Sequence, residues 1–414
     1  MKQPIFIHSL FRTGSTYLWN AFRQQEDTYC YYEPFNQFLS RIDVDRPYVW
    51  GDSQAATGKV RHPRLARNQL YEYKKLLRPG KQGVPFFKKA FSFDDYCNNE
   101  PDPDRKKYID HLLHGAAEEG KTPVLQFNRS ALRAKWFKAN YPASLHIYLA
   151  RSPRDQWQSY VSLAEEQGLD IFLIMDLMIA GKSKSAPYFK NLAPYVYLAS
   201  FDSPGFPQEE QAYRSLLGTY SYEELYFIFY FIWFTALWEN VIHSDILLSI
   251  DLLNSDAAYT RQVLDILAGH GIAGVDLSGA AARHYSGYKL DPEKTAHIEA
   301  SVRAIILQDR DSRERDHFLS KLSPAEKELF DLGEESLTSR NDAILEPLSK
   351  DDLIKKQEAV IEQLLQSNIK LDKKNNELEL AEQALRRTRN SYSYKAGKLL
   401  LFPFRMLKKL FNVK

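Results

Sequence analysis

The sequence predicts an α/β domain in which helices cover both faces of a mostly parallel sheet, giving three layers. Apolar runs typical of buried strands recur at residues 4–10, 122–130, 144–152 and 245–253. Segments with helical spacing of apolar residues follow three of these runs, at about 13–25, 154–168 and 258–271. Strands that alternate with helices are typical of parallel sheets that are buried on both faces.

The composition is that of a globular protein without a strong net charge. Of its 414 residues, 44% are hydrophobic and 13% aromatic, which allows a substantial core. The 55 Lys and Arg against 53 Asp and Glu leave a net charge of +2, so no overall field points to nucleic acid. Two cysteines, Cys30 and Cys97, argue against a disulfide framework. The apolar stretch at the N-terminus is too short for a signal peptide, and we expect a cytoplasmic protein.

The chain between residues 155 and 240 has mostly helical patterns and is expected to form a cap. Its most apolar stretch, residues 225–238, has 14 residues and is flanked by glutamates. A helix that spans a membrane needs about 20. We therefore expect a buried core helix at this place rather than a membrane span.

The composition changes near residue 350, which predicts a globular domain over 1–345 and a coiled coil over 351–390. The second segment contains no Pro or Gly and carries a heptad pattern. Its d positions are Leu364, Leu371, Leu378 and Leu385, and its a positions include Ile354, Ile361, Asn368 and Asn375. Leu at d with Asn at a favours a parallel two-stranded coiled coil and hence a homodimer. A single solvated helix is the alternative, because Asn368 and Asn375 are polar and Glu382 takes the next a position.

The last segment, residues 393–414, is predicted to be a basic amphipathic helix. From Lys395 onward it has six basic side chains and no acidic one, with Leu, Phe and Met between them. Such segments bind anionic membrane surfaces. We expect peripheral contact with the inner face of the membrane, and a helix docked on the protein's own core is the alternative.

The loop after the first strand has the residues of an anion site. In "FRTGST", residues 11–16, Gly14 lets the backbone come close, the hydroxyl residues offer donors and Arg12 adds a bidentate cation. The following helix directs its positive end at whatever lies over the loop. The order of strand, loop and helix is P-loop-like, but the Gly-Lys-Ser/Thr ending that holds a triphosphate and magnesium is missing. A loop that begins with Arg suits an anion handled without a metal.

A second strand-to-helix turn, "IYLARSPRDQWQSYVSL", places Arg151 at the strand end and Ser159 eight residues later. Together the two stretches resemble the sulfotransferases that use 3′-phosphoadenylyl sulfate (PAPS). The resemblance covers residues 4–25 and 122–165 well, and the chain to about residue 290 loosely. Taken alone, the second stretch could equally be an ordinary helix start with a surface Arg.

The resemblance implies a role for each matching residue. In that family an Arg/Lys-Ser/Thr-Gly-Ser/Thr loop holds the 5′-phosphosulfate, and an Arg and a Ser in a second turn hold the 3′-phosphate. The residues implied for the first role are Arg12, Thr13, Gly14, Ser15 and Thr16. Arg151 and Ser159 are implied for the second. PAPS is the implied co-substrate, and no Cys/His spacing suggests a metal.

Glu33, in "CYYEPFN", is the expected general base. It lies 21 residues after Arg12, at the expected end of the strand that follows the first helix, where Pro34 turns the chain. Glycan and tyrosylprotein sulfotransferases have a similar Glu that acts as base. A surface Glu in a turn is the alternative. The small-molecule branch of the family uses His instead, and the candidates here are His8, His111 and His114.

Arg129 is the residue expected to steady the leaving group. It follows Asn128 at the end of a predicted strand, and the two align with an Asn-Lys pair that contacts the bridging oxygen in the tyrosylprotein branch. Lys88 and Lys89 are competitors, with a solvated edge as the alternative. The family's C-terminal Lys-Gly-x-x-Gly-x-Trp loop is absent, and its candidate replacements are Tyr288 and Lys289.

These features predict a sulfotransferase that moves a sulfuryl group from PAPS to a hydroxyl of a glycan, in a bacterial envelope pathway. Two alternatives remain open. A nucleotide-dependent kinase with a degenerate P-loop would need magnesium and an acidic pair near the loop, and the sequence shows no convincing Asp pair. A non-catalytic protein would use the coiled coil as a membrane tether.

Overall fold

The computed structural model describes residues 2–44, 65, 67–201, 206–285, 287, 289–333 and 345–390. The chain divides into two compact units, Met1–Leu353 and Ile354–Lys414. The predicted boundary lies a few residues earlier, between 345 and 351. The predicted tail, residues 393–414, lies outside the described residues, as does Tyr288.

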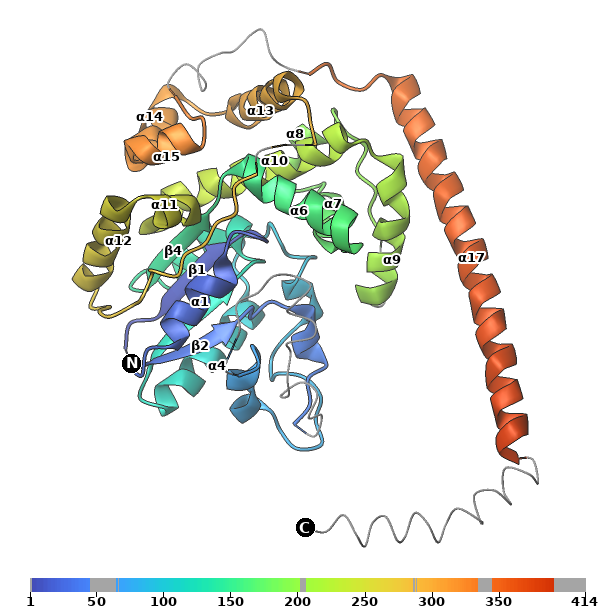
Figure 1. The fold of residues 1–414 in the computed structure, drawn as a ribbon, viewed down its shortest axis with the longest axis horizontal. Coiled ribbons are helices and arrows are strands. Elements are labelled where there is room, and N and C mark those ends of the chain that lie inside the picture. Colours follow the sequence, from blue (N-terminus) through green and yellow to red (C-terminus); the bar gives the residue numbers. More distant parts are fainter. Residues whose placement is uncertain are drawn as a thin grey trace, which may run out of the picture. The chain divides into compact units, whose positions relative to one another are not determined.

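Five parallel strands form one sheet in the first unit. They are β1 (Ile5–Ser9), β2 (Thr28–Tyr32), β3 (Thr122–Phe127), β4 (Leu145–Ala150) and β5 (Ile246–Ser249). Their order across the sheet is β2-β3-β1-β4-β5, and each neighbouring pair is parallel. The predicted α/β fold with a parallel sheet is therefore confirmed (Figure 1).

Helices account for most of the remaining described residues. The α-helices of the first unit are α1 (Ser15–Arg23), α4 (Pro103–Glu118), α5 (Ala134–Asn140), α6 (Pro153–Gln167), α7 (Ile171–Lys182), α8 (Pro187–Leu192), α9 (Phe206–Leu216), α10 (Tyr222–His243), α11 (Ile250–Ser255), α12 (Ala257–Gly269), α13 (Pro292–Leu307), α14 (Ser312–Lys321) and α15 (Pro324–Leu329). Short 3₁₀ helices are η1 (Gln37–Ser40), η2 (Tyr71–Leu76), η3 (Lys89–Phe91), η4 (Ala131–Arg133) and η5 (Leu217–Thr219). Helix α17 (Lys350–Asn390) forms the described part of the second unit and begins just before it.

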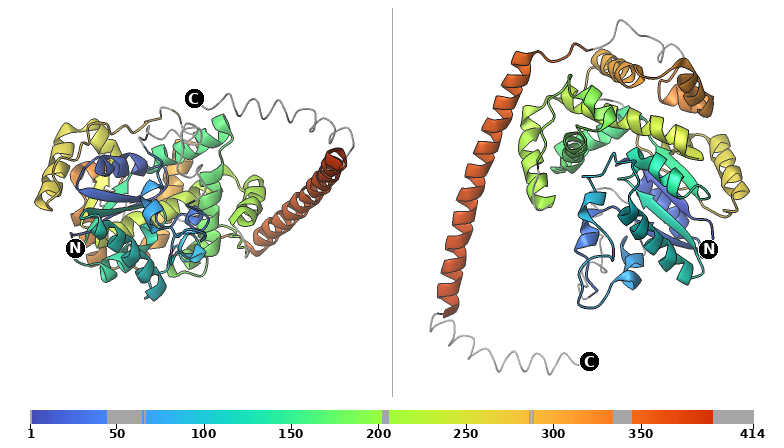
Figure 2. Two further views of the ribbon diagram at one scale, coloured as in Figure 1. Left: turned by 90° about the horizontal axis from the view of Figure 1, so that it is seen from below. Right: turned by 180° about the vertical axis from the view of Figure 1, so that it is seen from behind.

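Alternate residues of β1 face two different layers of helices. Ile5 and Ile7 pack in one core with α1, α11 and α12, whereas Phe6 packs in a second core with α4 and α5. Every residue of β1 is buried. This explains why the strand reads as a continuous apolar run rather than an alternating one. Figure 2 shows the helices on either side of the sheet from two further directions.

The strands are shorter than predicted, most clearly in the last one. Only Ile246–Ser249 of the run 245–253 form a strand, and the chain turns directly into α11. The reason is local, because the Ser249 hydroxyl accepts a hydrogen bond of 3.3 Å from the Leu252 N–H and so caps a helix. Strands β3 and β4 end at Phe127 and Ala150, which leaves Arg129 and Arg151 in loops.

Helix α10 is the core helix that the sequence predicts. By length and composition it could cross a membrane, but 94% of its most apolar window is buried in the protein. Its N-terminus has a capping box formed by Ser221 and Glu224. Trp233 on this helix donates a hydrogen bond of 3.1 Å to the Arg151 carbonyl oxygen, so α10 supports the loop at the end of β4.

Candidate functional site

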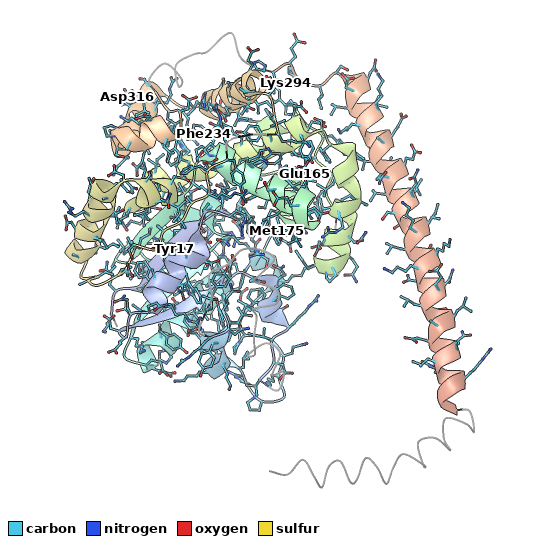
Figure 3. The ribbon with its side chains drawn as sticks, in the orientation of Figure 1. Tyr17, Glu165, Met175, Phe234, Lys294 and Asp316 are labelled. Carbon is cyan, nitrogen blue, oxygen red and sulfur yellow. The ribbon has the colours of Figure 1, made fainter. Side chains whose placement is uncertain are left out.

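The described residues enclose a cavity of about 620 Å³ at the carboxyl edge of the sheet. Residues that follow each of the five strands line it, and among them are Arg12, Glu33, Asn128, Arg151 and Ile250. After β1 the chain continues toward β2 and β3, and after β4 it continues toward β5 on the other side. Ligands of open α/β sheets bind at such a reversal, because the diverging loops leave a crevice there. Tyr17 of α1 and Met175 of α7, which both line the cavity, are labelled in Figure 3.

The first turn of α1 faces this cavity without a side-chain cap. Gly14 occupies the N-cap position with φ 85°, and no acidic residue lies in the first turn. A Cβ atom at Gly14 would also lie 2.9 Å from Ile250 Cγ1, so both the backbone angle and the space require glycine. Ser15 and Thr16 line the cavity, and the Thr16 hydroxyl lies 2.9 Å from that of Tyr32. The positive end of the helix is therefore directed at the cavity.

The structure brings the two predicted phosphate motifs together. Arg12 Nε donates to Ser159 Oγ over 3.3 Å, and Arg151 Nη1 donates to the Arg12 carbonyl oxygen over 3.2 Å. Helix α6 also holds the loop after β1, because Gln156 and Tyr160 both donate to the Phe11 carbonyl oxygen, over 2.7 and 3.2 Å. The two guanidinium groups thus share one cavity.

Thr13 is the one member of the first motif that does not line the cavity. It is 1% exposed, and its hydroxyl donates to the Leu10 carbonyl oxygen over 3.0 Å. Its side chain therefore closes the turn after β1, whereas the side chains of Arg12, Ser15 and Thr16 face the cavity.

Glu33 and Arg129 form a buried ion pair at the wall of the cavity. Arg129 Nη1 donates to Glu33 Oε2 over 2.6 Å, and the side chains are only 3% and 4% exposed. The guanidinium group also lies over the rings of Phe11 and Phe93, at 5.2 and 5.1 Å from their centroids. Glu33 therefore sits directly after β2, at the strand end predicted for it.

Burial raises the pKa of the Glu33 carboxyl above its ordinary value of 4.5. The charge of Arg129 and hydrogen bonds from Asn128 oppose this shift. The Asn128 side chain is itself oriented, because its Oδ1 accepts hydrogen bonds from Ser9 (2.6 Å) and Gln126 (2.8 Å). A carboxylate with a raised pKa that remains ion-paired can accept a proton at neutral pH.

Arg12 and Glu33 both have left-handed backbone conformations, with φ of 63° and 49°. Only two other non-glycine residues among those described, Phe86 and Asp331, have positive φ. Such strain in non-glycine residues is typical of functional sites, where the surrounding structure holds it in place. The sequence carries no sign of it.

Arg133 adds a further cation behind the cavity. It is fully buried between the rings of Phe35 and Tyr96, and its Nε and Nη1 atoms have no hydrogen-bond partner. Burial lowers the pKa of this guanidinium to about 9, so it stays charged at neutral pH. The Tyr96 hydroxyl donates to the Asn128 carbonyl oxygen over 3.1 Å, which links this layer to the cavity wall.

Two further cavity residues that could contact an anion were not expected from the sequence, and both lie in the loop after α12. Arg283 and Tyr285 line the cavity, and the Arg283 guanidinium lies 4.8 Å from the centre of the Tyr285 ring. The Arg283 carbonyl oxygen accepts a hydrogen bond of 2.5 Å from Arg151 Nη2. Lys289, the predicted replacement, does not line the cavity and pairs with Glu165 over 2.6 Å. An Arg two residues before a Tyr in this loop was the available signal.

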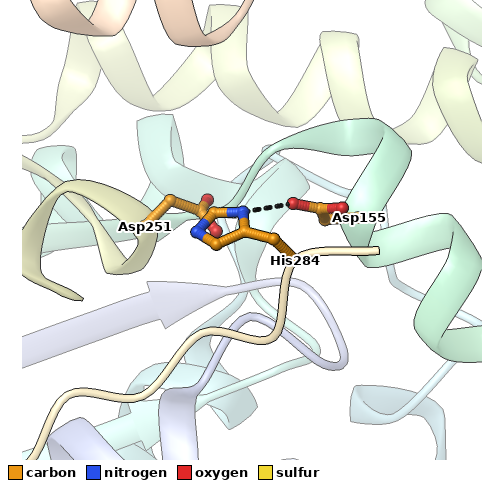
Figure 4. Close-up of side chains that lie close together, drawn as sticks. All are labelled: Asp155, Asp251 and His284. Atoms are coloured by element: carbon orange, nitrogen blue, oxygen red, sulfur yellow. Dashed lines mark hydrogen bonds and ion pairs between the residues drawn. The ribbon is translucent and has the colours of Figure 1, made fainter. Parts of the chain in front are cut away.

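Asp155, Asp251 and His284 form a cluster beside Arg151 (Figure 4). His284 Nδ1 lies 2.7 Å from Asp155 Oδ2, and the Tyr285 N–H donates to Asp155 Oδ1 over 3.2 Å. Asp251 accepts from the Ser152 N–H over 2.6 Å, and its other oxygen lies 3.9 Å from Arg151 Nε.

One ligand atom from each residue of this cluster lies within 4.8 Å of the others, a spacing that could hold a metal ion. Asp155 also holds the loop that carries Arg283 and Tyr285, through its contacts with His284 and with the Tyr285 N–H. The sequence shows no convincing Asp pair, because Asp155 and Asp251 lie far apart along the chain. They come close in the structure because they follow the neighbouring strands β4 and β5.

The competing candidates lie elsewhere. His8 is buried in the sheet, with Nδ1 2.7 Å from Ser130 Oγ. His114 pairs with Glu118 at the surface, and Lys88 pairs with Asp104. None of these residues lines the cavity, nor do His111 and Lys89.

Comparisons with protein-family models, curated proteins and solved structures find no match to this chain. The chemical capacity of the site must therefore be read from its geometry. It offers several guanidinium groups and a helix N-terminus to an anion, and a carboxylate to a proton donor.

Proposed function

We propose that the chain is a P-loop-like sulfotransferase that moves a sulfuryl group from PAPS to a hydroxyl of a glycan. One observation carries this proposal: Arg12, Arg151 and Ser159 meet in a single cavity that Glu33 also lines. A donor with two separated phosphate groups needs two cationic positions in one crevice, and a transfer to a hydroxyl needs a base nearby.

The nucleotide would lie across the loops after β1 and β4. Arg12, the first turn of α1 and the hydroxyls of Ser15 and Thr16 would bind the 5′-phosphate and the sulfuryl group. Arg151 and Ser159 would bind the 3′-phosphate, with Arg283 and Tyr285 beside them. Four arginines of the described chain line the cavity, and three of them, Arg12, Arg151 and Arg283, would face the phosphate groups of the donor, whereas Arg129 pairs with Glu33.

In the reaction, the acceptor hydroxyl oxygen attacks the sulfur atom and its proton passes to Glu33. The bond between sulfur and the bridging phosphate oxygen breaks, and that oxygen keeps the electron pair. The products are a sulfate ester and 3′-phosphoadenosine 5′-phosphate (PAP). Arg12 and the α1 amides stabilise charge on the transferring group, and Arg129 steadies both Glu33 and the leaving oxygen.

The residues around Glu33 support a sugar as acceptor. Phe38, Phe172 and Ile171 offer apolar surface, and Asn36 and Gln69 offer neutral amides. Phe38 is 55% exposed at the rim. Aromatic rings pack against the C–H face of a sugar, while side-chain amides both donate hydrogen bonds to its hydroxyls and accept hydrogen bonds from them. The basic segment 393–414 would hold the enzyme at the inner face of the membrane, next to lipid-linked glycans.

A nucleotide-dependent kinase is a second candidate, because Asp155, Asp251 and His284 could hold a metal ion beside Arg151. Phosphoryl transfer from a nucleoside triphosphate depends on such an ion. The two candidates differ in their response to a chelator. Sulfuryl transfer would persist in excess chelator, whereas phosphoryl transfer would stop.

The direct test is transfer of labelled sulfate from PAPS to a panel of glycans, with chelator present. The full-length protein should label at least one glycan, and Glu33→Gln should label it at a much lower rate. Transfer of labelled phosphate from ATP that stops when chelator is added would identify the protein as a kinase instead. If neither group is transferred to any acceptor, the better explanation is a non-catalytic protein that uses the coiled coil as a membrane tether.

A further inference from the structure

Among the described residues, helix α17 carries most of the exposed large apolar side chains. Twelve such side chains are exposed among the described residues, and eight of them lie on this helix. They are Ile354, Ile361, Leu365, Ile369, Leu371, Leu378, Leu380 and Leu385, with exposed fractions of 39% to 67%. Exposed apolar surface of this extent on one element marks an interaction surface.

Five of these eight side chains fall on one seam of the helix. Ile354 and Ile361 take a positions of the heptad, and Leu371, Leu378 and Leu385 take d positions. Leu365 borders the seam at e, whereas Ile369 and Leu380 lie outside it at b and f. The helix is continuous over 41 residues, or about 60 Å, so the seam is not interrupted by a break in the backbone.

We propose that the partner of this seam is α17 of a second copy of the chain, aligned in parallel and in register. Asn368 and Asn375 then each face their own counterpart across the seam, where paired amides satisfy one another. The same side chains would be poorly matched against an apolar groove of an unrelated protein, since buried amides without partners are costly.

The charges beside the seam support the parallel register. In a parallel dimer each g residue faces the e residue five positions later in the partner chain. Lys374 at g thus faces Glu379 at e of the partner copy, an attractive pair that occurs twice in the dimer. The neighbouring g-to-e pairs combine Ser367 with Asp372 and Ala381 with Arg386, so no like charges meet.

The parallel arrangement has a consequence for the basic segment after α17. Both chains leave the coiled coil at the same end, so their two copies of residues 393–414 follow from one point. Two weak membrane contacts on one particle bind more tightly than either alone, because the second contact forms at a high effective concentration. The dimer is independent of the proposed enzymatic activity.

The test exchanges the two charges that flank the seam in the full-length protein. Lys374→Glu places two glutamates opposite each other at both contacts, and Glu379→Lys places two lysines there. The double exchange Lys374→Glu with Glu379→Lys restores opposite charges, as does an equimolar mixture of the two single variants. Lys373→Glu and Glu377→Lys are the matched controls, because these residues lie at the outer f and c positions and are equally exposed.

Sedimentation equilibrium gives the readout. The wild type and both controls should reach twice the 48.0 kDa of one chain. The dissociation constant of the dimer should be severalfold higher for each single charge variant. For the double variant and for the mixture it should return to the wild-type value. A wild-type chain that stays at 48.0 kDa at all concentrations overturns the dimer. Single variants that match their controls, or a double exchange without recovery, overturn the parallel register.

Discussion

Arg151 Nη1 donates a hydrogen bond of 3.2 Å to the Arg12 carbonyl oxygen, although 139 residues separate the two in the sequence. The pair arises because β1 and β4 are direct neighbours in the sheet, so that their following loops share one edge. Arg12 reaches Ser159 of α6 in turn, over 3.3 Å. Two cationic turns that could each be an ordinary surface feature thus lie at the wall of one cavity.

Replacing Glu33 by Gln tests the base. The amide keeps the shape of the side chain but cannot accept the proton, so kcat should fall about 10²- to 10⁴-fold. PAP should still bind, because Arg12, Arg151 and Ser159, which are proposed to hold its phosphate groups, are unchanged. Glu26→Gln, at an exposed position, is the control and should retain full activity. Equal turnover in the wild type and Glu33→Gln would remove Glu33 from its role.

The pH dependence of the activity follows from the raised pKa of Glu33. The base must be ionised, so activity is lost as pH falls through the pKa of Glu33. The acid limb of the kcat/KM profile should therefore lie above pH 4.5. Arg129→Met removes the charge that lowers this pKa, and the limb should move to higher pH.

Arg129→Lys is the conservative comparison, because it keeps the charge while losing the fork geometry. Its acid limb should lie between those of the wild type and Arg129→Met. Both variants lower kcat if Arg129 contacts the leaving oxygen, so the position of the limb is the decisive readout. If the acid limb of Arg129→Met lies at the same pH as that of the wild type, the ion pair between Arg129 and Glu33 does not set the pKa of Glu33.

The contact between His284 and Asp155 is expected to position the loop over the nucleotide. His284 is 54% exposed, so His284→Ala should fold normally and only loosen the loop. Loss of about 1 kcal/mol in nucleotide affinity would raise the KM for PAPS about 5-fold, with little change in kcat. His297→Ala, at an exposed position of α13, is the control. A fall in kcat at unchanged KM would contradict the positioning role.

The free energy of unfolding should fall as pH rises because of Asp176 of α7, a buried carboxyl group. It is 5% exposed, its Oδ2 atom has no hydrogen-bond partner, and burial raises its pKa well above 3.8. The unfolded chain then releases a proton that the folded protein keeps, so the free energy of unfolding falls with pH up to the folded-state pKa. The slope approaches about 1.4 kcal/mol per pH unit.

Asp176→Asn removes this ionisation. The stability of the variant relative to the wild type should increase as pH rises from about 4 toward the folded-state pKa of Asp176, as measured by urea unfolding at several pH values. Asp265→Asn, an exposed position on α12, is the control. Parallel stability curves for wild type and Asp176→Asn would show that Asp176 ionises normally in the folded protein.

The sequence is most informative where short-range patterns decide structure. The strand before Arg12, the helix after Gly14 and the buried character of α10 follow from hydrophobic periodicity and local turn chemistry. The run 245–253 shows the limit, because an apolar stretch fits a strand or a helix and one capping Ser decides between them. The order of strands is a long-range property that such patterns do not contain.

The site divides in the same way. Arg12, Glu33, Arg129 and Arg151 lie in recognisable loops after strands, and Ser159 lies on the helix after one of them. The structure places all five around one cavity. An Arg two residues before a Tyr is a weak signal for Arg283 and Tyr285, because their relation to Arg151, like that of the acidic cluster, depends on how the loop after α12 folds back. The strained backbone of Arg12 and Glu33 also depends on their tertiary surroundings.

The most direct test of the account is calorimetric binding of PAP and of adenosine 5′-diphosphate, both without metal. PAP has one phosphate on each side of the ribose, whereas the diphosphate has both on the 5′ side. The account predicts that PAP binds about 10- to 100-fold more tightly, since a charged hydrogen bond to Arg151 contributes about 1.5–3 kcal/mol. Arg151→Met should abolish this preference, and Arg313→Met, at an exposed position, should keep it. Equal binding of the two nucleotides by the wild type, or an unchanged preference in Arg151→Met, would contradict the account.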